Sequence, residues 1–446
     1  MASAAEQLAG SINFGALAKA KELKKKIYFT LAALIVYRLG TYIPLPGIES
    51  QVLDDIFQQN AGGILGMFDM FSGGALSRMT IFALNIMPYI SASIIIQLMT
   101  TVSPHLATLK KDGDAGRKKI IQYTRYGTVL LAAVQGLGIA SGLENLTSSS
   151  GPAVMAPGLM FKFTTVVSLT GGTVFLMWLG EQITARGIGN GISLIIMSGI
   201  VANLPVSLVS TLELGKTGAL SGLLIMFLLL MSVAVIAFIV FVERAQRRLL
   251  IQYPKRQVGM KVFQGDTNHL PLKINTAGVI PPIFASSILL LPVTVMSFNA
   301  GSGPSWLLDV TSLLGRGQPL YMALYVGAIT FFAFFYTSIV FSPEDTADNL
   351  QKNNGFIPGI RPGKNTALYI DHVLTRLTVV GALYLSLVCI LPEILIAKYA
   401  VPFYFGGTSL LIVVNVTMDT VAQIHSHLIA QQYEGLIKKS KLRGRI

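Results

Sequence analysis

Cysteine and charged residues are both scarce in this sequence. Its 446 residues include one cysteine, Cys389, which excludes a disulfide framework and a cysteine-rich metal site. Charged residues make up 12% of the chain, whereas soluble domains carry about 25%. Because so few charges cannot cover a 47.9 kDa chain with a wettable surface, the composition excludes a water-soluble enzyme.

The sequence also lacks motifs for catalysis and nucleotide hydrolysis. It contains no His-Glu-x-x-His and no Gly-x-Ser-x-Gly segment. Its five histidines all lie outside the centres of the long apolar stretches. Gly215-Lys216-Thr217 lacks the upstream glycine of a P-loop, because position 210 is serine. We therefore expect no enzymatic activity, no cofactor and no metal.

Long apolar stretches are what the sequence has in abundance. The hydrophobic share is 52% and the mean hydropathy is +0.62. A bilayer core about 30 Å thick needs about 20 mostly apolar helical residues to cross it. We therefore expect an all-α membrane protein with ten transmembrane helices. The ten candidate stretches are 27–48 (interrupted by Arg38), 79–109, 126–143, 163–180, 187–212, 217–242, 274–308, 317–343, 377–392 and 399–418.

The basic residues fall almost entirely on one side of these stretches. Of the 34 lysines and arginines, 28 lie in the N-terminal segment, at Arg186, in loops 110–125, 243–275 and 344–376, or in the tail from residue 434. Because cytoplasmic loops carry the excess of basic residues, this side is expected to be cytoplasmic, with both termini on it. The net charge of +13 then reflects membrane topology rather than chemistry.

Two of the basic loops, 243–275 and 344–376, are longer than topology requires. Each has 33 residues, whereas most connections have about 4–6. In the second loop, Pro358-Gly359 and Pro362-Gly363 flank Arg361, and such a turn points the arginine outward. One interpretation is a solvated loop that only sets the topology. The other is a docking site for an acidic or RNA-containing cytoplasmic partner.

Ionisable residues are nearly absent from the centres of the apolar stretches. Arg38 lies close enough to an end of its stretch to reach the interface, and Lys162 and Glu181 flank theirs. Ion-coupled carriers keep ionisable groups near the bilayer centre. The pattern therefore disfavours an ion-coupled secondary transporter, which remains the alternative function.

Isoleucines lie in the middle of several stretches. Ile86 and Ile90 are four residues apart and share a helix face, as do Ile192 and Ile196. Spacing of this kind more often marks lipid-facing or packing residues than a pore. A rise of about 1.5 Å per helical residue places four isoleucines roughly 15–21 Å from a flanking basic residue, near the midplane: Ile90, Ile196, Ile283 and Ile412.

Eight segments carry more information than periodicity. Residues 87–98 read Met-Pro-Tyr-Ile-Ser-Ala-Ser-Ile-Ile-Ile-Gln-Leu, and residues 71–78 read Phe-Ser-Gly-Gly-Ala-Leu-Ser-Arg. Together the segments resemble the SecY/Sec61-alpha family of protein-conducting channels, in the family's order. One departure is Asn85, where the family usually has glycine; a second polar residue, Asn415, has no assigned place. The other six segments are 122–127, 180–184, 186–193, 270–273, 358–363 and 402–412.

The resemblance implies a clamshell of two five-helix halves, 1–216 and 217–446, around an hourglass pore. The waist of the pore would be a ring of six apolar residues that excludes water at rest: Ile86, Ile90, Ile192, Ile196, Ile283 and Ile412. A plug segment, about 62–77, would block the outer funnel with residues that include Gly62, Gly66, Phe68, Phe71, Gly73 and Gly74. Signal sequences would enter lipid through a lateral gate that includes Ser91, Gln97 and Asn275.

The same resemblance implies a function and partners. The chain would be the channel subunit of a Sec translocon in the bacterial inner membrane, where it passes unfolded secretory polypeptides across and releases membrane helices into lipid. Its stable partners would be the small subunits SecE and SecG, and SecA with ATP, the ribosome or the proton gradient would drive transport. SecA and ribosomal RNA would dock on basic residues of the long loops: Arg247, Arg248, Lys255, Arg256 and Arg361.

Overall fold

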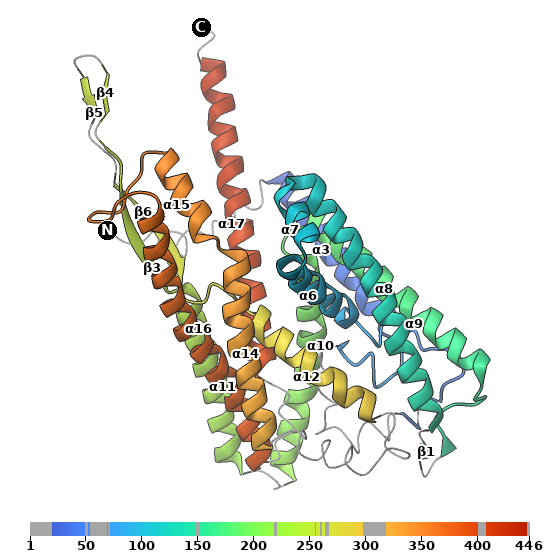
Figure 1. The fold of residues 1–446 in the computed structure, drawn as a ribbon. Helices are drawn as coiled ribbons and strands as arrows, with labels where there is room; N and C mark the ends of the chain where they lie inside the picture. Colours follow the sequence, from blue (N-terminus) through green and yellow to red (C-terminus); the bar gives the residue numbers. More distant parts are fainter. Residues whose placement is uncertain are drawn as a thin grey trace. The chain divides into compact units, whose positions relative to one another are not determined.

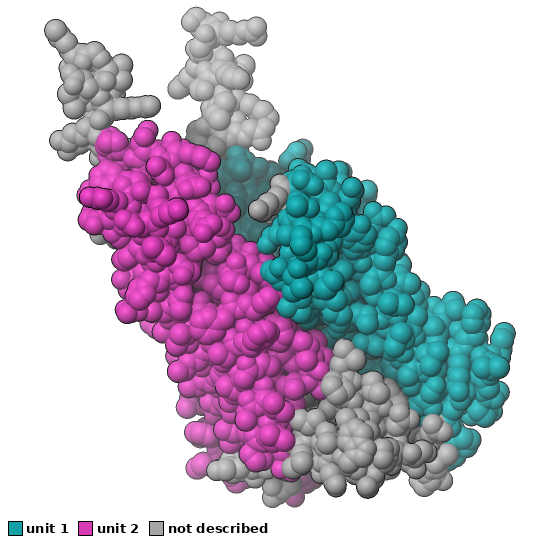
Figure 2. Space-filling model, in the orientation of Figure 1, with its two compact units in different colours: residues 1–208, 294–304, 412–446 teal, residues 209–293, 305–411 magenta. Residues whose placement is uncertain are grey.

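Helices dominate the part of the chain that the structure, a computed structural model, describes (Figure 1). The described residues form two compact units, each of which is treated by itself (Figure 2). Unit 1 contains residues 1–208, 294–304 and 412–446, and unit 2 contains residues 209–293 and 305–411. The described residues are 20–49, 52–53, 69, 72–145, 147–148, 151–217, 221–254, 256–258, 261–263, 267–297, 318–399 and 407–443.

In unit 1, the longest paired helices are α8 (Gly113–Asn145) and α9 (Leu159–Arg186), which run side by side (Figure 1). Arg125 donates two hydrogen bonds to the Glu181 carboxylate, at 2.6 and 3.0 Å. At the other end of the pair, Lys162 Nζ lies 3.0 Å from Glu144 Oε2. Ion pairs therefore fasten α8 to α9 at both ends. The other elements that the structure describes in the first 216 residues are α3 (Lys21–Gly40), α6 (Met87–Val102), α7 (Pro104–Lys111), β1 (Thr147–Ser148), β2 (Gly151–Pro152) and α10 (Gly191–Lys216), which continues into unit 2.

The apolar stretch 79–109 is not one straight helix. Residues 81–86 form turns, with Met79 and Asn85 at positive φ angles of 43° and 50°. The α6 axis then changes direction by 102° at the break before α7. The break lies at Ser103, which is extended because Pro104 follows it. The apolar stretch therefore supplies a 16-residue helix, α6, and most of the short helix α7, rather than one long helix.

In unit 2, α11 (Gly222–Arg244) leads into a β-hairpin of β3 (Gln246–Gln252) and β6 (Thr267–Lys273). The strands are antiparallel over seven residue pairs, from Gln246↔Lys273 to Gln252↔Thr267. A shorter pair, β4 (Arg256–Val258) and β5 (Lys261–Phe263), lies between them in sequence and beyond them in Figure 1. The other helices are α12 (Ile280–Ser297), α14 (Pro319–Val340), α15 (Pro343–Lys352), α16 (Lys364–Tyr399) and α17 (Gly407–Arg443), which continues into unit 1.

The three predicted basic loops contain regular structure. Loop 110–125 is almost entirely helical, because α7 ends at Lys111 and α8 begins at Gly113. Loop 344–376 contains α15 and the first turns of α16. The sequence explains α15: Ser342 Oγ accepts a hydrogen bond from Asp345 N at 3.2 Å, proline occupies the first turn, and Glu344 and Asp345 face the positive helix end.

Seven helices in the described residues are long and apolar enough to cross a membrane, or eight if α6 and α7 form one broken span. The most apolar is α11, with a mean hydropathy of 3.2 over an 18-residue window in which only 11% of the residues are buried in the chain. Such a helix is stable only where its surroundings are apolar too. The prediction of a multi-spanning helical protein is therefore confirmed, whereas the number ten remains a prediction.

Candidate functional site

Two isoleucines predicted for the pore ring lie at the start of α6. Ile86 is the residue that precedes the helix, and its carbonyl oxygen accepts a hydrogen bond from Ile90 N at 3.0 Å. This first turn places the two side chains on one face. Both are buried, Ile86 to 1% exposure. Two branched apolar side chains thus lie on one face at the N-terminal end of α6.

Three further isoleucines lie on α10 and α17, which hydrogen bonds join within unit 1. Thr417 Oγ1 donates to Met197 Sδ at 3.6 Å, and Gly189 N donates to Gln423 Oε1 at 2.8 Å. These pairs run in opposite directions along the chain, so the two helices are antiparallel. Ile196 and Ile412 are buried, and Ile192, which is half-buried, packs against α9 at Gly180.

The level of Ile412 relative to Ile196 follows from this pairing. Residue 197 lies opposite residue 417, so residue 412 lies about five residues further along α10 than residue 197. At about 1.5 Å per residue, the two isoleucines lie within roughly 8–9 Å of each other along the helix axes. The pairing of α10 with α17 therefore places two predicted ring residues at levels that differ by about six residues along the helix axes.

The predicted depths of the isoleucines rest on helices that the structure does not contain. Ile196 is in the second turn of α10, which begins at Gly191 after a turn, and Ile283 is in the first turn of α12. Neither is joined to its basic neighbour, Arg186 or Lys273, by continuous helix. The arithmetic of 1.5 Å per residue was wrong here because glycine-containing turns, 187–190 and 274–279, separate these isoleucines from their basic neighbours. Ile283 is half-buried within unit 2.

Two polar residues lie next to ring isoleucines. Asn85 precedes Ile86, is buried, and has a φ of 50°, a conformation that asparagine tolerates better than most residues. Asn415 lies one turn after Ile412 on α17 and is 8% exposed. Its Nδ2 finds no hydrogen-bond partner among the residues that the structure describes. These two amides are buried polar groups beside two of the isoleucines predicted for the ring.

The end of the predicted plug segment is a tightly bonded turn. Asp69 Oδ1 accepts hydrogen bonds from Ser77 N at 2.7 Å and Leu76 N at 3.1 Å. Burial raises the pKa of the Asp69 carboxyl, although these bonds oppose the rise. Gly73 and Gly74, at φ of 68° and 82°, are buried in this turn. Gly62, Gly66, Phe68 and Phe71 lie outside the described residues.

Sequence reasoning missed the residue that holds this turn. Arg38 of α3 donates a hydrogen bond from Nη1 to Gly73 O at 2.8 Å, and Tyr37 Oη donates to Ser72 O at 3.3 Å. A Cβ on Gly73 would lie 2.9 Å from Gly199 Cα of α10, so glycine is required for this approach. The sequence did contain a signal for this role, because Arg38 is the charged residue that interrupts the apolar stretch 27–48. A charge in such a position is usually functional.

The three residues predicted for the lateral gate lie in different surroundings. Ser91 is buried in α6. Gln97, also in α6, donates from Nε2 to Ser93 Oγ one turn earlier at 3.4 Å. Asn275 is buried before α12, and its Nδ2 donates to Glu243 Oε1 at 2.6 Å. Asn275 is therefore bonded within unit 2, to the last turn of α11.

The two predicted docking loops form one surface in unit 2, which we call the basic platform: the β3–β6 hairpin with residues 353–363. Gln252 and Phe356 exchange two backbone hydrogen bonds of 2.9 and 3.0 Å. Beneath them, a hydrophobic cluster joins the hairpin to α16: Leu249, Leu272, Ile357, Ile370, Val373 and Leu374. The pairing of two loops so far apart in the sequence was not predicted.

The basic side chains of the platform face outward. Arg247 and Arg248 are exposed on β3, opposite Leu272 and Pro271. Arg361 is exposed in the expected turn, in which Gly359 and Gly363 have φ of 81° and 99°. Lys255 lies outside the described residues, and Arg256 is described only as part of the β4 backbone. At least three predicted docking residues therefore lie on the surface of one unit.

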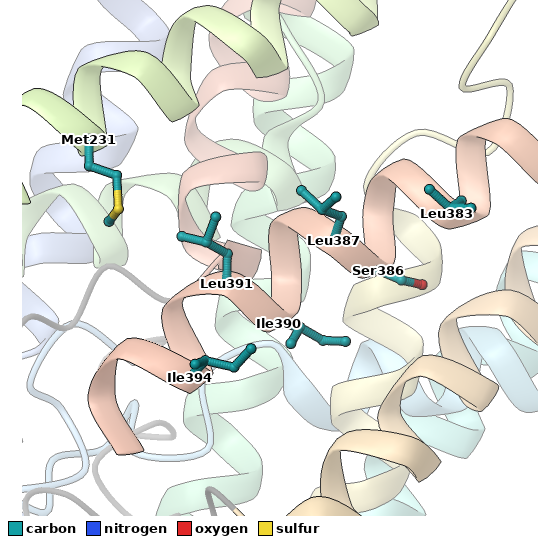
Figure 3. A pocket seen from close by; sticks show the side chains of 7 residues that line it. All are labelled: Met231, Leu383, Ser386, Leu387, Ile390, Leu391 and Ile394. Carbon is teal, nitrogen blue, oxygen red and sulfur yellow. The ribbon is translucent and has the colours of Figure 1, made fainter. Parts of the chain in front are cut away.

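An apolar cavity of about 540 Å³ lies between α11 and α16 (Figure 3). Its walls are apolar side chains and one hydroxyl, that of Ser386, and the lining residues include no histidine, lysine or carboxylate that could activate this hydroxyl. Among the described residues, no group of three or more histidine, cysteine, aspartate or glutamate side chains could hold a metal ion. The lining residues are Met231, Leu383, Ser386, Leu387, Ile390, Leu391 and Ile394.

Comparisons with known proteins agree with the motifs. The family model of SecY matches residues 80–421. The protein translocase subunit SecY of Escherichia coli K12 is 56% identical over 424 residues, which cover 95% of this chain and 96% of that protein. The fold is similar to a solved protein-conducting channel, with a TM-score of 0.61 and 16% identity over 90% of this chain and 92% of that one.

A second solved structure, Sec61 in a canine ribosome-channel complex from the endoplasmic reticulum, has a TM-score of 0.57. It is 16% identical over 90% of this chain and 92% of that one. Identity this low supports the fold alone, whereas the long alignment with the bacterial relative extends over nearly the whole of both chains. The chain belongs to the SecY family.

Proposed function

We propose that this chain is the protein-conducting channel subunit of a Sec translocon in a bacterial inner membrane. The observation that carries this proposal is the 56% identity to a protein translocase subunit along 95% of the chain. The seven or eight apolar spans support a multi-pass membrane location. The chain then conducts unfolded secretory polypeptides and is not an enzyme.

The seal of the resting channel follows from the chemistry of the proposed ring: Ile86, Ile90, Ile192, Ile196, Ile283 and Ile412. Branched apolar side chains exclude water and ions from a narrow passage by dewetting. They make no directional bonds, so the ring widens around a passing chain without breaking any. The pairing of α10 with α17 supports this assignment for Ile196 and Ile412.

We further propose the finer topology that the family resemblance implies. The eight candidate spans, with α3 and α12 added, make ten crossings in two halves, 1–216 and 217–446. Both termini are then cytoplasmic, on the side that carries 28 of the 34 basic residues. Residues 62–77 act as the plug, and Ser91, Gln97 and Asn275 belong to the lateral gate for signal sequences and nascent membrane helices.

The proposed partners follow from the basic platform and from the relatives. A fold neighbour is Sec61 in a ribosome-channel complex, and ribosomal RNA is a polyanion that exposed arginines attract. We propose that the ribosome and the SecA motor dock on Arg247, Arg248, Lys255, Arg256 and Arg361. SecE and SecG are the proposed stable subunits, and ATP hydrolysis or the proton gradient supplies the energy from outside this chain.

Depletion of the protein separates this function from the alternative, an ion-coupled secondary transporter. If the protein is a translocation channel, its depletion leaves uncleaved secretory precursors in the cytoplasm within a few generations, whatever solute the medium contains. If it is a transporter, its depletion abolishes the uptake of one small solute and leaves precursor processing intact. Normal processing after full depletion contradicts the proposed function.

A further inference from the structure

The two ends of the β3–β6 hairpin meet at a buried hydrogen bond. Glu243 lies in the last turn of α11, three residues before β3 begins, and Asn275 lies two residues after β6 ends. Asn275 Nδ2 donates to Glu243 Oε1 at 2.6 Å, with 4% and 8% of the two residues exposed. A bond of this kind to a carboxylate is roughly twice as strong as one between neutral groups.

The backbone closes the hairpin at the same place. Ile274 N donates to Ala245 O at 3.2 Å, which continues the ladder beyond the last residue pair of the hairpin. The amide of Asn275 also reaches forward, because Nδ2 donates to Gly278 O at 3.1 Å. Gly278 is in the turn from which α12 begins. One side-chain amide therefore joins the end of α11 to the start of α12.

A third helix restricts the space around this bond. A Cβ on Gly381 of α16 would lie 3.1 Å from Ile274 O and 3.6 Å from Asn275 Cα. Because the backbone of α16 approaches so closely, the segment between β6 and α12 cannot shift toward it. We call Glu243, Ile274, Asn275 and Gly381 the hairpin-base junction.

The other end of the hairpin is held as well. Gln252, the last residue of β3, is paired with Phe356 of the basic platform. The seven residue pairs of the hairpin are thus held at both ends, by Phe356 at one end and by the hairpin-base junction at the other. This gives an unbroken series of bonded contacts from the platform to the start of α12.

We propose that Glu243 and Asn275 are positioning residues that couple a partner docked on the basic platform to α12. This inference rests on the proposed docking function. Without their bond, the platform still binds its partner through exposed arginines. The start of α12, however, then keeps only the Ile274 backbone bond and the chain itself as links to the hairpin, so that binding changes the position of this helix much less.

The test uses the full channel complex in nanodiscs with purified bacterial ribosomes as the probe. An environment-sensitive thiol fluorophore is attached at Ile288→Cys, which replaces an exposed residue of α12. The native Cys389 is 1% exposed and stays unlabelled. Ribosome affinity is measured by cosedimentation, and the response of α12 by the fluorescence change at saturating ribosome.

Glu243→Ala is expected to bind ribosomes within about twofold of the parent and to lose at least about fivefold of the fluorescence response. Glu243→Gln, which keeps the shape, is expected to lose less. Asn275→Asp places two carboxylates together and is expected to behave like Glu243→Ala. In the double variant Glu243→Gln with Asn275→Asp, the new amide at position 243 can donate to the new carboxylate, and part of the response is expected to return. Glu213→Gln, on an exposed position of α10, is the matched control and leaves both readouts unchanged.

A full response in Glu243→Ala overturns the coupling, and so does a double variant that is no better than Asn275→Asp alone. A parent complex that binds ribosomes without any change at position 288 overturns it too. If Glu243→Ala fails to fold, the graded response of Glu243→Gln decides. The proposed docking function is tested separately with the double variant Arg247→Ala and Arg248→Ala. If this variant binds ribosomes as tightly as the parent does, the docking proposal fails, whatever the response of α12.

Discussion

The guanidinium of Arg38 donates a 2.8 Å hydrogen bond to the carbonyl oxygen of Gly73, and so fastens the end of the proposed plug segment to α3. A charge within an apolar stretch costs free energy unless it is bonded, and this bond accounts for the arginine. The same guanidinium lies 5.7 Å from the ring of Tyr42, which Arg78 also covers at 4.3 Å. Two cations therefore meet one aromatic ring just after the C-terminal end of α3.

Replacing Arg38 with methionine is expected to loosen the plug segment. The change keeps most of the side-chain length but removes the donor to Gly73 O, and a hydrogen bond to a charged group contributes about 1.5–3 kcal/mol. The closed state should lose at least about tenfold in population, seen as resting ion conductance in planar bilayers. Arg117→Met, at an exposed position of α8, is the control, and equal conductance in both variants contradicts the role of Arg38.

Asparagine at Ile86, Ile196 or Ile412 is expected to hydrate the proposed ring. Each change places hydrogen-bonding groups in a constriction whose barrier is the exclusion of water. Single-channel recordings should show a resting leak for all three variants, whereas leucine at the same positions keeps the seal. If none of the three asparagine variants leaks, these residues do not form the constriction.

Arg361→Lys separates docking from topology. Lysine satisfies the positive-inside rule as well as arginine does, so a purely topogenic residue tolerates the change. A bidentate contact to carboxylate or phosphate does not survive it, because lysine lacks the planar fork of guanidinium. We expect normal insertion but about tenfold weaker stimulation of SecA ATPase by precursor, which corresponds to a loss of roughly 1.5 kcal/mol or more. Full stimulation returns Arg361 to a topogenic role.

Two neighbouring glycines of α9 give a matched pair for the packing of unit 1. A Cβ on Gly172 would clash with the carbonyl oxygen of Ile81, and a backbone atom cannot move aside as the end of a side chain can. Gly171 has no atom within 4 Å of its Cβ position. Gly172→Ala is expected to destabilise by about 1–3 kcal/mol and Gly171→Ala to be neutral or slightly stabilising. Thermal unfolding in detergent measures both, and equal melting temperatures argue against the close contact.

Some of these features follow from local sequence and others do not. Apolar stretches are recognised because the cost of placing a residue in lipid depends mainly on the residue itself. The turn at Arg361 was predictable for a similar reason, since Pro358 and Gly359 restrict the backbone locally. The pairing of Gln252 with Phe356 depends instead on the packing of two distant segments, and no pattern within either one specifies it.

The bond between Asn275 and Glu243 shows the same limit. Asparagine before a helix reads as an ordinary cap, and glutamate at the end of an apolar helix as an interfacial charge. Only the hairpin between them, which returns the chain to its starting point, brings these groups together. Arg38 was visible as an unusual charge, but its acceptor, a backbone carbonyl, carries no side-chain signature at all.

The sharp break after α6 has a consequence for the lipid around it. With 16 residues and a rise of about 1.5 Å each, α6 is about 24 Å long, roughly 6 Å shorter than an average hydrocarbon core. Where this helix faces lipid, the bilayer must become thinner to meet its ends, at a cost of fractions of a kcal/mol per Å. In the proposed topology, the hydrophobic mismatch of α6 would therefore thin the membrane beside it, and a thinner bilayer is a lower barrier for any polar segment that leaves the protein at that point.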